Sequence, residues 1–222
     1  MNLFIIDTSS KYLYIACAIG DKVFYHYEDE LDMKHSETLL VKIDQLLSKN
    51  KLSLSDTDIF CACTGPGSFT GIRIGVTTAR AFAQIYNKPT MAVNSLELIA
   101  YNINKKGIAM PLSYAVNGKY YCAAYQDGKT VMPPAVIKIE DLNNLRQSLI
   151  KKYETEEVFF IYPDNIDGVK GIIKPCLPLD YTRYCKQKEK ENNYGDYNKL
   201  VPEYAALSQA EKEYEDKIRK LC

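Results

Sequence analysis

The chain has 222 residues, enough for one large or two small domains without disulfides. Its 28 Lys and Arg balance its 28 Asp and Glu, and the first 110 residues hold 11 of each. Stand-alone nucleic-acid binders usually carry a basic excess, so composition argues against tight RNA binding by this chain alone. No apolar run is long enough to span a bilayer, and Asp7 follows the first apolar residues too soon for a signal peptide. We therefore expect a cytoplasmic protein without a membrane partner.

The first half predicts three strands and then alternating helices and strands. The expected strands are 3–8, 12–19, 22–28, 58–64 and 90–93, and the expected helices cover 36–48, 70–86 and a segment from Ser95. This order is typical of an actin-like, ribonuclease-H-like half domain. Seven scattered cysteines have neither paired spacing nor enough histidines for a zinc site, and we expect them to be reduced core residues.

A glycine-rich turn, GPGSFTGIRIG at residues 65–75, leads from a buried strand into a helix. Glycines permit a close backbone approach, and a helix N-terminus offers unpaired N–H groups to an anion or a neighbouring loop. The spacing matches neither a Rossmann loop nor a P-loop. A tight turn kept for packing is therefore as good an interpretation as a binding loop.

In the helix that follows, residues at four-residue steps are almost without side chains: Gly71, Gly75, Ala79 and Ala83. Each glycine inside a helix costs about 1 kcal/mol relative to alanine, so this stripe needs a packing reason. Either the chain's own sheet or the helix of a second protein lets a neighbour come this close. From the residues alone, the intramolecular contact is favoured.

The second half begins again with a hairpin over 111–126, marked by the strong turn signal Asn117-Gly118. A strand over 129–138, a helix over 140–152 and a strand over 158–162 follow. Loops are expected over 163–198, and a charged helical tail starts at the capping box Ser208-x-x-Glu211. The sequence thus predicts an α/β protein with two tandem half domains, 1–105 and a smaller, degenerate 106–222.

Several segments, in order and at appropriate spacing, resemble the TsaB family, also called YeaZ. They are FIIDTSS at 4–10, HSETLL at 35–40, GPGSFTGIRIG at 65–75, VNSLELIA at 93–100 and, more weakly, LVPEYAALSQAE at 200–211. The chain departs from the family at 116–119, where Val-Asn-Gly-Lys replaces a frequent Asp-Ala-Arg hairpin.

The resemblance implies an ASKHA fold and a part in bacterial synthesis of threonylcarbamoyladenosine at position 37 of tRNAs that read ANN codons. In that family TsaB is a non-catalytic partner subunit. The paralogue TsaD transfers the threonylcarbamoyl group, the ATPase TsaE joins the assembly, and tRNA is bound only within the complex. No cofactor is expected, and a homodimer competes for the partner surface.

The TsaD-like metal motif, His-x-x-x-His, falls on Ser95 and Ile99 of this chain. Isoleucine has no donor atom and a lone serine is a poor ligand, so we expect no metal site. Phosphate-binding loops of the ASKHA type match two segments, which we expect to be degenerate. Their residues are Asp7, Thr8, Ser9, Gly65, Gly67, Ser68 and Thr70.

The resemblance places the partner interface on the helices at 36–48 and 70–86. The residues predicted for it are His35, Leu39, Gly71, Arg73, Gly75, Val76, Ala79, Arg80 and Ala83. For His35, a structural role at the helix start or the interface is preferred to catalysis. The alternatives to a scaffold are an ASKHA ATPase or kinase that uses Asp7 and the glycine turn, and a glycoprotease-type metallopeptidase that would require ligands at Ser95 and Ile99.

Overall fold

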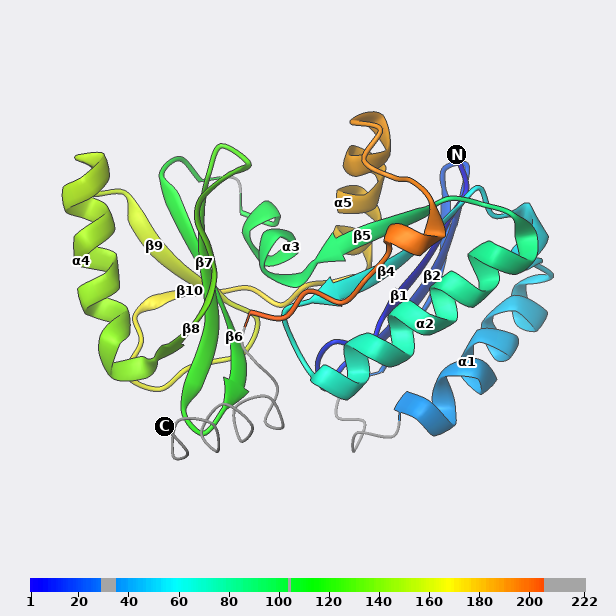
Figure 1. The fold of residues 1–222 in the computed structure, drawn as a ribbon, viewed down its shortest axis with the longest axis horizontal. Helices are drawn as coiled ribbons and strands as arrows, with labels where there is room; N and C mark the ends of the chain where they lie inside the picture. The colour runs from blue at the N-terminus through cyan, green and yellow to red at the C-terminus, as the bar shows by residue number, and fades with distance from the viewer. Residues whose placement is uncertain (29–34, 104, 206–222) are drawn as a thin grey trace, which may run out of the picture.

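The computed structural model describes residues 1–28, 35–103 and 105–205, which form two lobes, each built on a five-stranded sheet (Figure 1). The first sheet has the order β3-β2-β1-β4-β5 and the second the order β10-β9-β6-β7-β8. In each sheet a three-stranded antiparallel meander is extended by two parallel strands. The predicted duplication of an actin-like, ribonuclease-H-like unit is confirmed.

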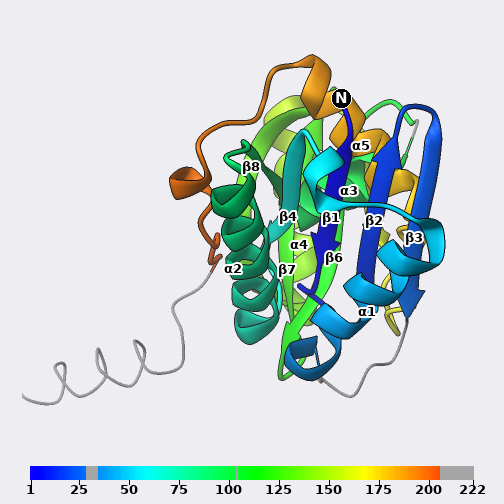
Figure 2. The same cartoon turned by 90° about the vertical axis from the view of Figure 1, so that its right-hand side faces the viewer.

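The first lobe contains most of the helical mass. Its elements are β1 (Leu3–Asp7), β2 (Leu13–Ile19), β3 (Lys22–Glu28), α1 (His35–Asn50), the 3-10 turn η1 (Leu54–Asp56), β4 (Ile59–Gly65), α2 (Phe69–Tyr86), β5 (Thr90–Asn94) and α3 (Ser95–Tyr101). Helices α1 and α2 lie side by side on one face of the sheet (Figure 2). Helices α3 and α5 contact strands from the other side.

The second lobe repeats the plan but has no helix between its two parallel strands. Its elements are β6 (Ile108–Val116), β7 (Lys119–Gln126), β8 (Lys129–Lys138), η2 (Ile139–Asp141), α4 (Leu142–Tyr153), β9 (Val158–Tyr162) and β10 (Gly171–Ile173). The elements that follow in the chain, α5 (Pro178–Lys190) and η3 (Tyr197–Lys199), pack against the first lobe. Asn117 and Gly118 both take positive φ at the β6–β7 turn, as the Asn-Gly signal predicts.

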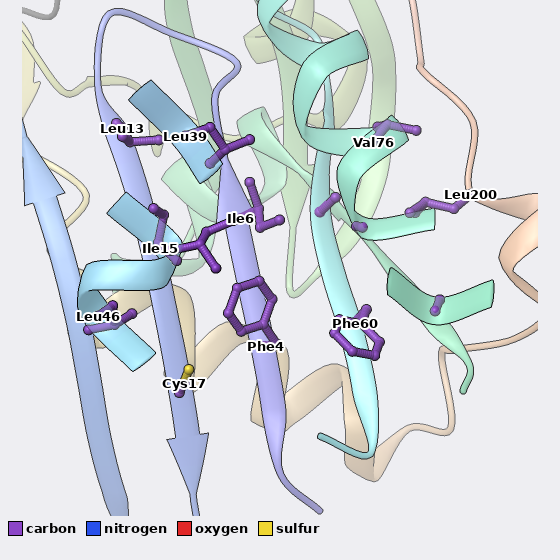
Figure 3. Close-up of a cluster of buried hydrophobic side chains, with 14 of the residues drawn as sticks. Phe4, Ile6, Leu13, Ile15, Cys17, Leu39, Leu46, Phe60, Val76 and Leu200 are labelled. Carbon is purple, nitrogen blue, oxygen red and sulfur yellow. The ribbon is translucent and has the colours of Figure 1, made fainter. Parts of the chain in front are cut away.

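Alternation along the central strands divides the first lobe's core in two. Phe4 and Ile6 face α1 and α2, whereas Leu3 and Ile5 face the side covered by α5. The first cluster joins Leu39 and Leu46 of α1 to Val76 of α2 (Figure 3). Both faces of β1 are therefore buried, which explains its four consecutive apolar residues, Leu3 to Ile6.

The loops expected over 163–198 are only partly present, because α5 forms there. Its buried apolar residues are Tyr181, Tyr184 and Cys185, and most of its other residues are polar. An apolar periodicity carried by two tyrosines and a cysteine is weak, so the sequence pattern did not predict this helix. Helix α5 and Leu200 pack on the first sheet, so the chain returns to the first lobe after β10. The predicted tail helix lies outside the described residues.

The stripe on α2 packs against the chain's own first strand, which corrects the partner-face interpretation. A Cβ added to Gly71 would lie 1.9 Å from the Thr8 carbonyl oxygen, and one added to Gly75 would lie 2.6 Å from the Thr8 hydroxyl. Ala79 and Ala83 are fully buried in the same cluster. A bulky residue at position 75 would therefore clash within the free chain, whether or not a partner is present.

We expect Gly71→Ala to destabilise the free protein by about 2 kcal/mol, because the backbone of Thr8 must move. At about 2–4 °C per kcal/mol for a chain of this size, thermal denaturation should show a clear fall in Tm. The matched control is Ala81→Leu on the exposed face of the same helix, which should leave Tm nearly unchanged. A higher Tm for Gly71→Ala, from helix propensity alone, would contradict this packing.

Candidate functional site

The two phosphate-loop segments meet at the carboxyl end of β1, where they are bonded to each other. The Ser68 N–H donates to the Ser9 carbonyl at 2.6 Å, and the Thr8 hydroxyl donates to the Gly71 carbonyl at 2.7 Å. A Cβ on Gly67 would lie 2.2 Å from the Ser9 carbonyl oxygen. The glycines are thus required by a close contact between backbones, and the 7–9 loop covers the start of α2.

Asp7 is buried and both of its carboxylate oxygens have partners within the chain. Oδ1 accepts the Ser9 N–H at 2.7 Å, and Oδ2 accepts the Tyr181 hydroxyl at 2.8 Å. Burial, and secondarily the Asp7 carboxylate, raise the pKa of Tyr181 well above its usual range, so its hydroxyl remains a donor. The same two causes raise the pKa of Cys63, whose thiol donates to the Ser9 hydroxyl.

The remaining loop residues complete the turn without pointing to a phosphate. Ser68 caps α2 by accepting the Gly71 N–H, and Thr70 is exposed. Gly65 has φ of +110° and is packed between Ile72 and the carbonyl of Glu203.

A C-terminal strap, residues 200–204, holds the glycine turn from outside. The Glu203 N–H donates to the Thr64 carbonyl at 2.8 Å, and the Glu203 carboxylate accepts from Asn94. Tyr204 stacks on Phe69 at 4.6 Å and accepts a hydrogen bond from Arg73, whose guanidinium lies 3.8 Å over the Phe69 ring. Tyr204 is 131 residues from Arg73 along the chain, and no local sequence pattern predicts their contact.

The positions that match metal ligands in the paralogue serve other purposes. The Ser95 hydroxyl donates to the Pro66 carbonyl at 2.6 Å. Ile99 belongs to an apolar cluster with Leu96, Ala123 and Ile161. In the part of the chain that the structure describes, no three His, Cys, Asp or Glu side chains gather as a metal site would need.

Most residues predicted for the partner interface are buried inside the chain, which corrects that list. His35, Leu39 and Val76, like the glycine and alanine stripe, are nearly inaccessible. His35 starts α1 and donates from Nε2 to the Ser10 carbonyl at 2.9 Å, a contact that ties α1 to the 7–12 loop. Only Arg73, which is exposed, and Arg80, which is half-buried, reach the surface.

The outer face of the α1–α2 pair carries other residues that reasoning from the stripe missed. Its exposed apolar side chains are Leu40 and Val41 on α1 and Ile85 on α2, with exposed fractions of 60%, 54% and 71%. Helix α2 has no acidic residue, and its remaining exposed positions include Thr77, Ala81 and Gln84. Charged side chains on this face come mainly from α1, where Glu37, Asp44 and Lys49 are exposed.

A cleft of about 330 Å³ opens between the lobes next to Asp7. The first lobe contributes the 7–12 loop, Ser68, Ser95 and Ile99, and the second contributes residues 112–115 and 162–166. Its tyrosines are Tyr12, Tyr27, Tyr114, Tyr120, Tyr162 and Tyr181. In the sequence these six tyrosines are dispersed, and they come together only in the folded chain.

Comparisons with known proteins agree with this architecture. The family model described as TsaD, tRNA N6-adenosine threonylcarbamoyltransferase, matches residues 29–168. The tRNA threonylcarbamoyladenosine biosynthesis protein TsaB of Bacillus subtilis is 30% identical over 228 residues, which cover 95% of this chain and 96% of that protein.

The chain belongs to the TsaB/YeaZ family.

Other comparisons separate this family from the transferase itself. TsaB of Escherichia coli is 28% identical over 70% of both chains. A tRNA N6-adenosine threonylcarbamoyltransferase of Rhizobium etli is 40% identical, but over 63 residues that make up 17% of that protein. The structure of YeaZ from Pseudomonas aeruginosa superposes with a TM-score of 0.69 and 19% identity, covering 91% of this chain and 99% of that one. The full-length agreement is thus with TsaB.

No helix among the described residues is both long and apolar enough to cross a membrane.

The contact between Asp7 and Tyr181 should behave as a structural hydrogen bond. We expect Tyr181→Phe to lower the free energy of unfolding by about 1–3 kcal/mol, because a buried carboxylate loses a donor. Combined with Asp7→Asn, the loss in urea denaturation should be smaller than the sum of the single losses. The exposed Tyr25→Phe serves as the control, and additive losses would mean that the hydrogen bond contributes little.

Proposed function

We propose that this TsaB-family chain is the non-catalytic dimerisation and scaffold subunit of a tRNA threonylcarbamoyladenosine synthesis complex. In this assembly it binds and stabilises a TsaD-type paralogue, and a TsaE-type ATPase joins them. tRNA is modified only by the complex. The relatives are named for biosynthesis of this nucleoside. The internal hydrogen bonds of Asp7 are consistent with a subunit that does not itself catalyse the reaction.

The observation that carries the proposal is the outer face of α1 and α2. The two helices lie side by side on one face of the first lobe (Figure 2). Leu40, Val41 and Ile85 stand out from it, while the apolar side chains beneath are already buried in the core. A partner that presents two helices of its own would bury these residues in a four-helix contact, and a second copy of the chain would compete for the same surface.

An ATPase or kinase of the same fold is the alternative that the cleft would serve, and the contacts around Asp7 argue against it. Both carboxylate oxygens are held by the chain, so Mg²⁺ would have to displace Tyr181 or the Ser9 N–H. The Ser68 N–H at the start of α2 is bonded to Ser9 and is not available to a phosphate oxygen. A metallopeptidase would need ligands where Ser95 and Ile99 stand.

The partner surface is tested by Ile85→Glu. A carboxylate at this exposed position should cost the free chain little stability, yet it should weaken association with the TsaD paralogue by at least about tenfold, since an unpaired charge would be desolvated. Isothermal titration calorimetry and analytical size-exclusion chromatography measure the association.

The matched control is Ile173→Glu on β10, a 53% exposed isoleucine in the other lobe. It should bind the paralogue as the unmodified chain does. Equal binding by Ile85→Glu and the unmodified protein, with both folded, would remove the assignment of this face.

The lack of catalysis in the isolated chain is tested by reconstitution. The chain alone, with ATP or with threonylcarbamoyl adenylate and tRNA, should give no turnover above background, because Asp7 is committed to Ser9 and Tyr181. Modified nucleoside, measured by mass spectrometry of digested tRNA, should appear once the TsaD and TsaE partners are added. ATP hydrolysis by the purified chain that Asp7→Ala abolishes would favour the ATPase instead.

A further inference from the structure

The scaffold role proposed above does not involve the cleft between the lobes. Its volume of about 330 Å³ lies within the range of small-molecule sites. The walls combine aromatic rings from both lobes, including the stacked pair Tyr12–Tyr27 and the edge-to-face pair Tyr114–Tyr120. The cavity is therefore large enough, and apolar enough, to enclose a small organic molecule.

Few charged side chains line the cleft in the part of the chain that the structure describes. Among the described residues that line it, the charged side chains are Asp7, Asp164 and Lys11, and the buried Asp7 carboxylate already accepts hydrogen bonds from Ser9 and Tyr181. An anionic ligand would meet the Asp164 carboxylate beside Lys11, and the start of helix α2 is already covered by Ser9. A cation would meet the half-exposed carboxylate of Asp164 and the electron-rich faces of tyrosines, which together favour ammonium groups.

The chain's own Lys11 shows this recognition at the mouth of the cleft. Its ammonium group lies 3.4 Å from Asp164 Oδ1 and 5.0 Å from the centroid of the Tyr12 ring. The Tyr12 hydroxyl donates to the same Asp164 oxygen, so ring and carboxylate are held together as one unit across the two lobes. Lys11 and Asp164 are both about half exposed, which allows the lysine to be displaced.

We propose that the cleft is a binding site for a small organic cation, a protonated amine carried on an apolar, aromatic body. The ammonium group takes the place beside Asp164 and Tyr12 that Lys11 now occupies, and the body lies among the tyrosines. The pair formed by Lys11 and Asp164 is then an internal competitor that closes the empty site. This inference does not depend on the scaffold function, because the cleft and the α1–α2 face are different surfaces.

Three probes with the same ring and different charges test the proposal on the full chain: benzylammonium, benzyl alcohol and benzoate. Ligand-observed NMR titrations at low ionic strength should give an affinity for benzylammonium at least about fivefold higher than for benzyl alcohol, with benzoate weakest. Equal affinities for the amine and the alcohol would reduce the cleft to an apolar pocket and overturn the proposal. A preference for benzoate, or no binding of any probe, would do the same.

Variants at the mouth distinguish the proposed recognition from general charge effects. Lys11→Met removes the internal competitor and should tighten benzylammonium binding severalfold, whereas Asp164→Asn should weaken it by about the same factor. The control Lys138→Met changes a lysine that pairs with Glu140 at 3.1 Å outside the cleft lining, and it should have no effect. Unchanged or weaker binding by a folded Lys11→Met variant would overturn the assignment of the ammonium position.

The aromatic contribution is tested by Tyr114→Leu, which keeps an apolar side chain but removes the ring. This residue is 62% exposed, so the fold should tolerate the change. Benzylammonium should bind severalfold more weakly, whereas Tyr25→Leu on β3, outside the cleft lining, should bind like the unmodified chain. Equal weakening in both variants would show that the effect is not local and would count against the site.

Discussion

The contact between the backbone of Thr8–Ser9 and the glycines of the turn before α2 is the constraint on which the rest of the first lobe depends. It brings the carboxyl end of β1 against the start of α2 at distances that no side chain would allow at positions 67 and 71. With α2 fixed there, Ile72 and Val76 enter the core above Phe4 and Ile6. Helices α1 and α2 then lie side by side on the same face of the sheet.

The same contact explains how a phosphate-type loop serves structure. Backbone N–H groups and a carboxylate at the end of β1 are the usual means by which such folds hold phosphate and metal. In this chain Ser9 accepts the Ser68 N–H, and Tyr181 and the Ser9 N–H satisfy Asp7. These internal partners favour a rigid scaffold. The neighbouring cleft keeps its tyrosines and the Asp164 carboxylate, which suit a cation better than a nucleotide.

The two lobes are joined by segments that return from the second half to the first. Helix α5 fills the inner face of the first sheet with Tyr181 and Tyr184, and the strap at 200–204 holds the glycine turn. The strap stacks Tyr204 on Phe69 beside Arg73, at the start of the helix proposed to meet the partner. The orientation of that helix is thus tied to the end of the described chain.

The sequence by itself determined the strand and helix order of the first 162 residues, the duplicated α/β fold and the family. Local signals can be read from the sequence without tertiary information, and here they are the alternation in the strands, the Asn117-Gly118 turn and the motif at 65–75. Tertiary structure decided which neighbour meets the stripe of Gly71 and Gly75, because a bare helix face looks the same beside its own strand as beside a partner. It also decided the strap, helix α5 and the tyrosine cleft, since these depend on contacts between residues far apart in the chain, whose pairing no local periodicity records.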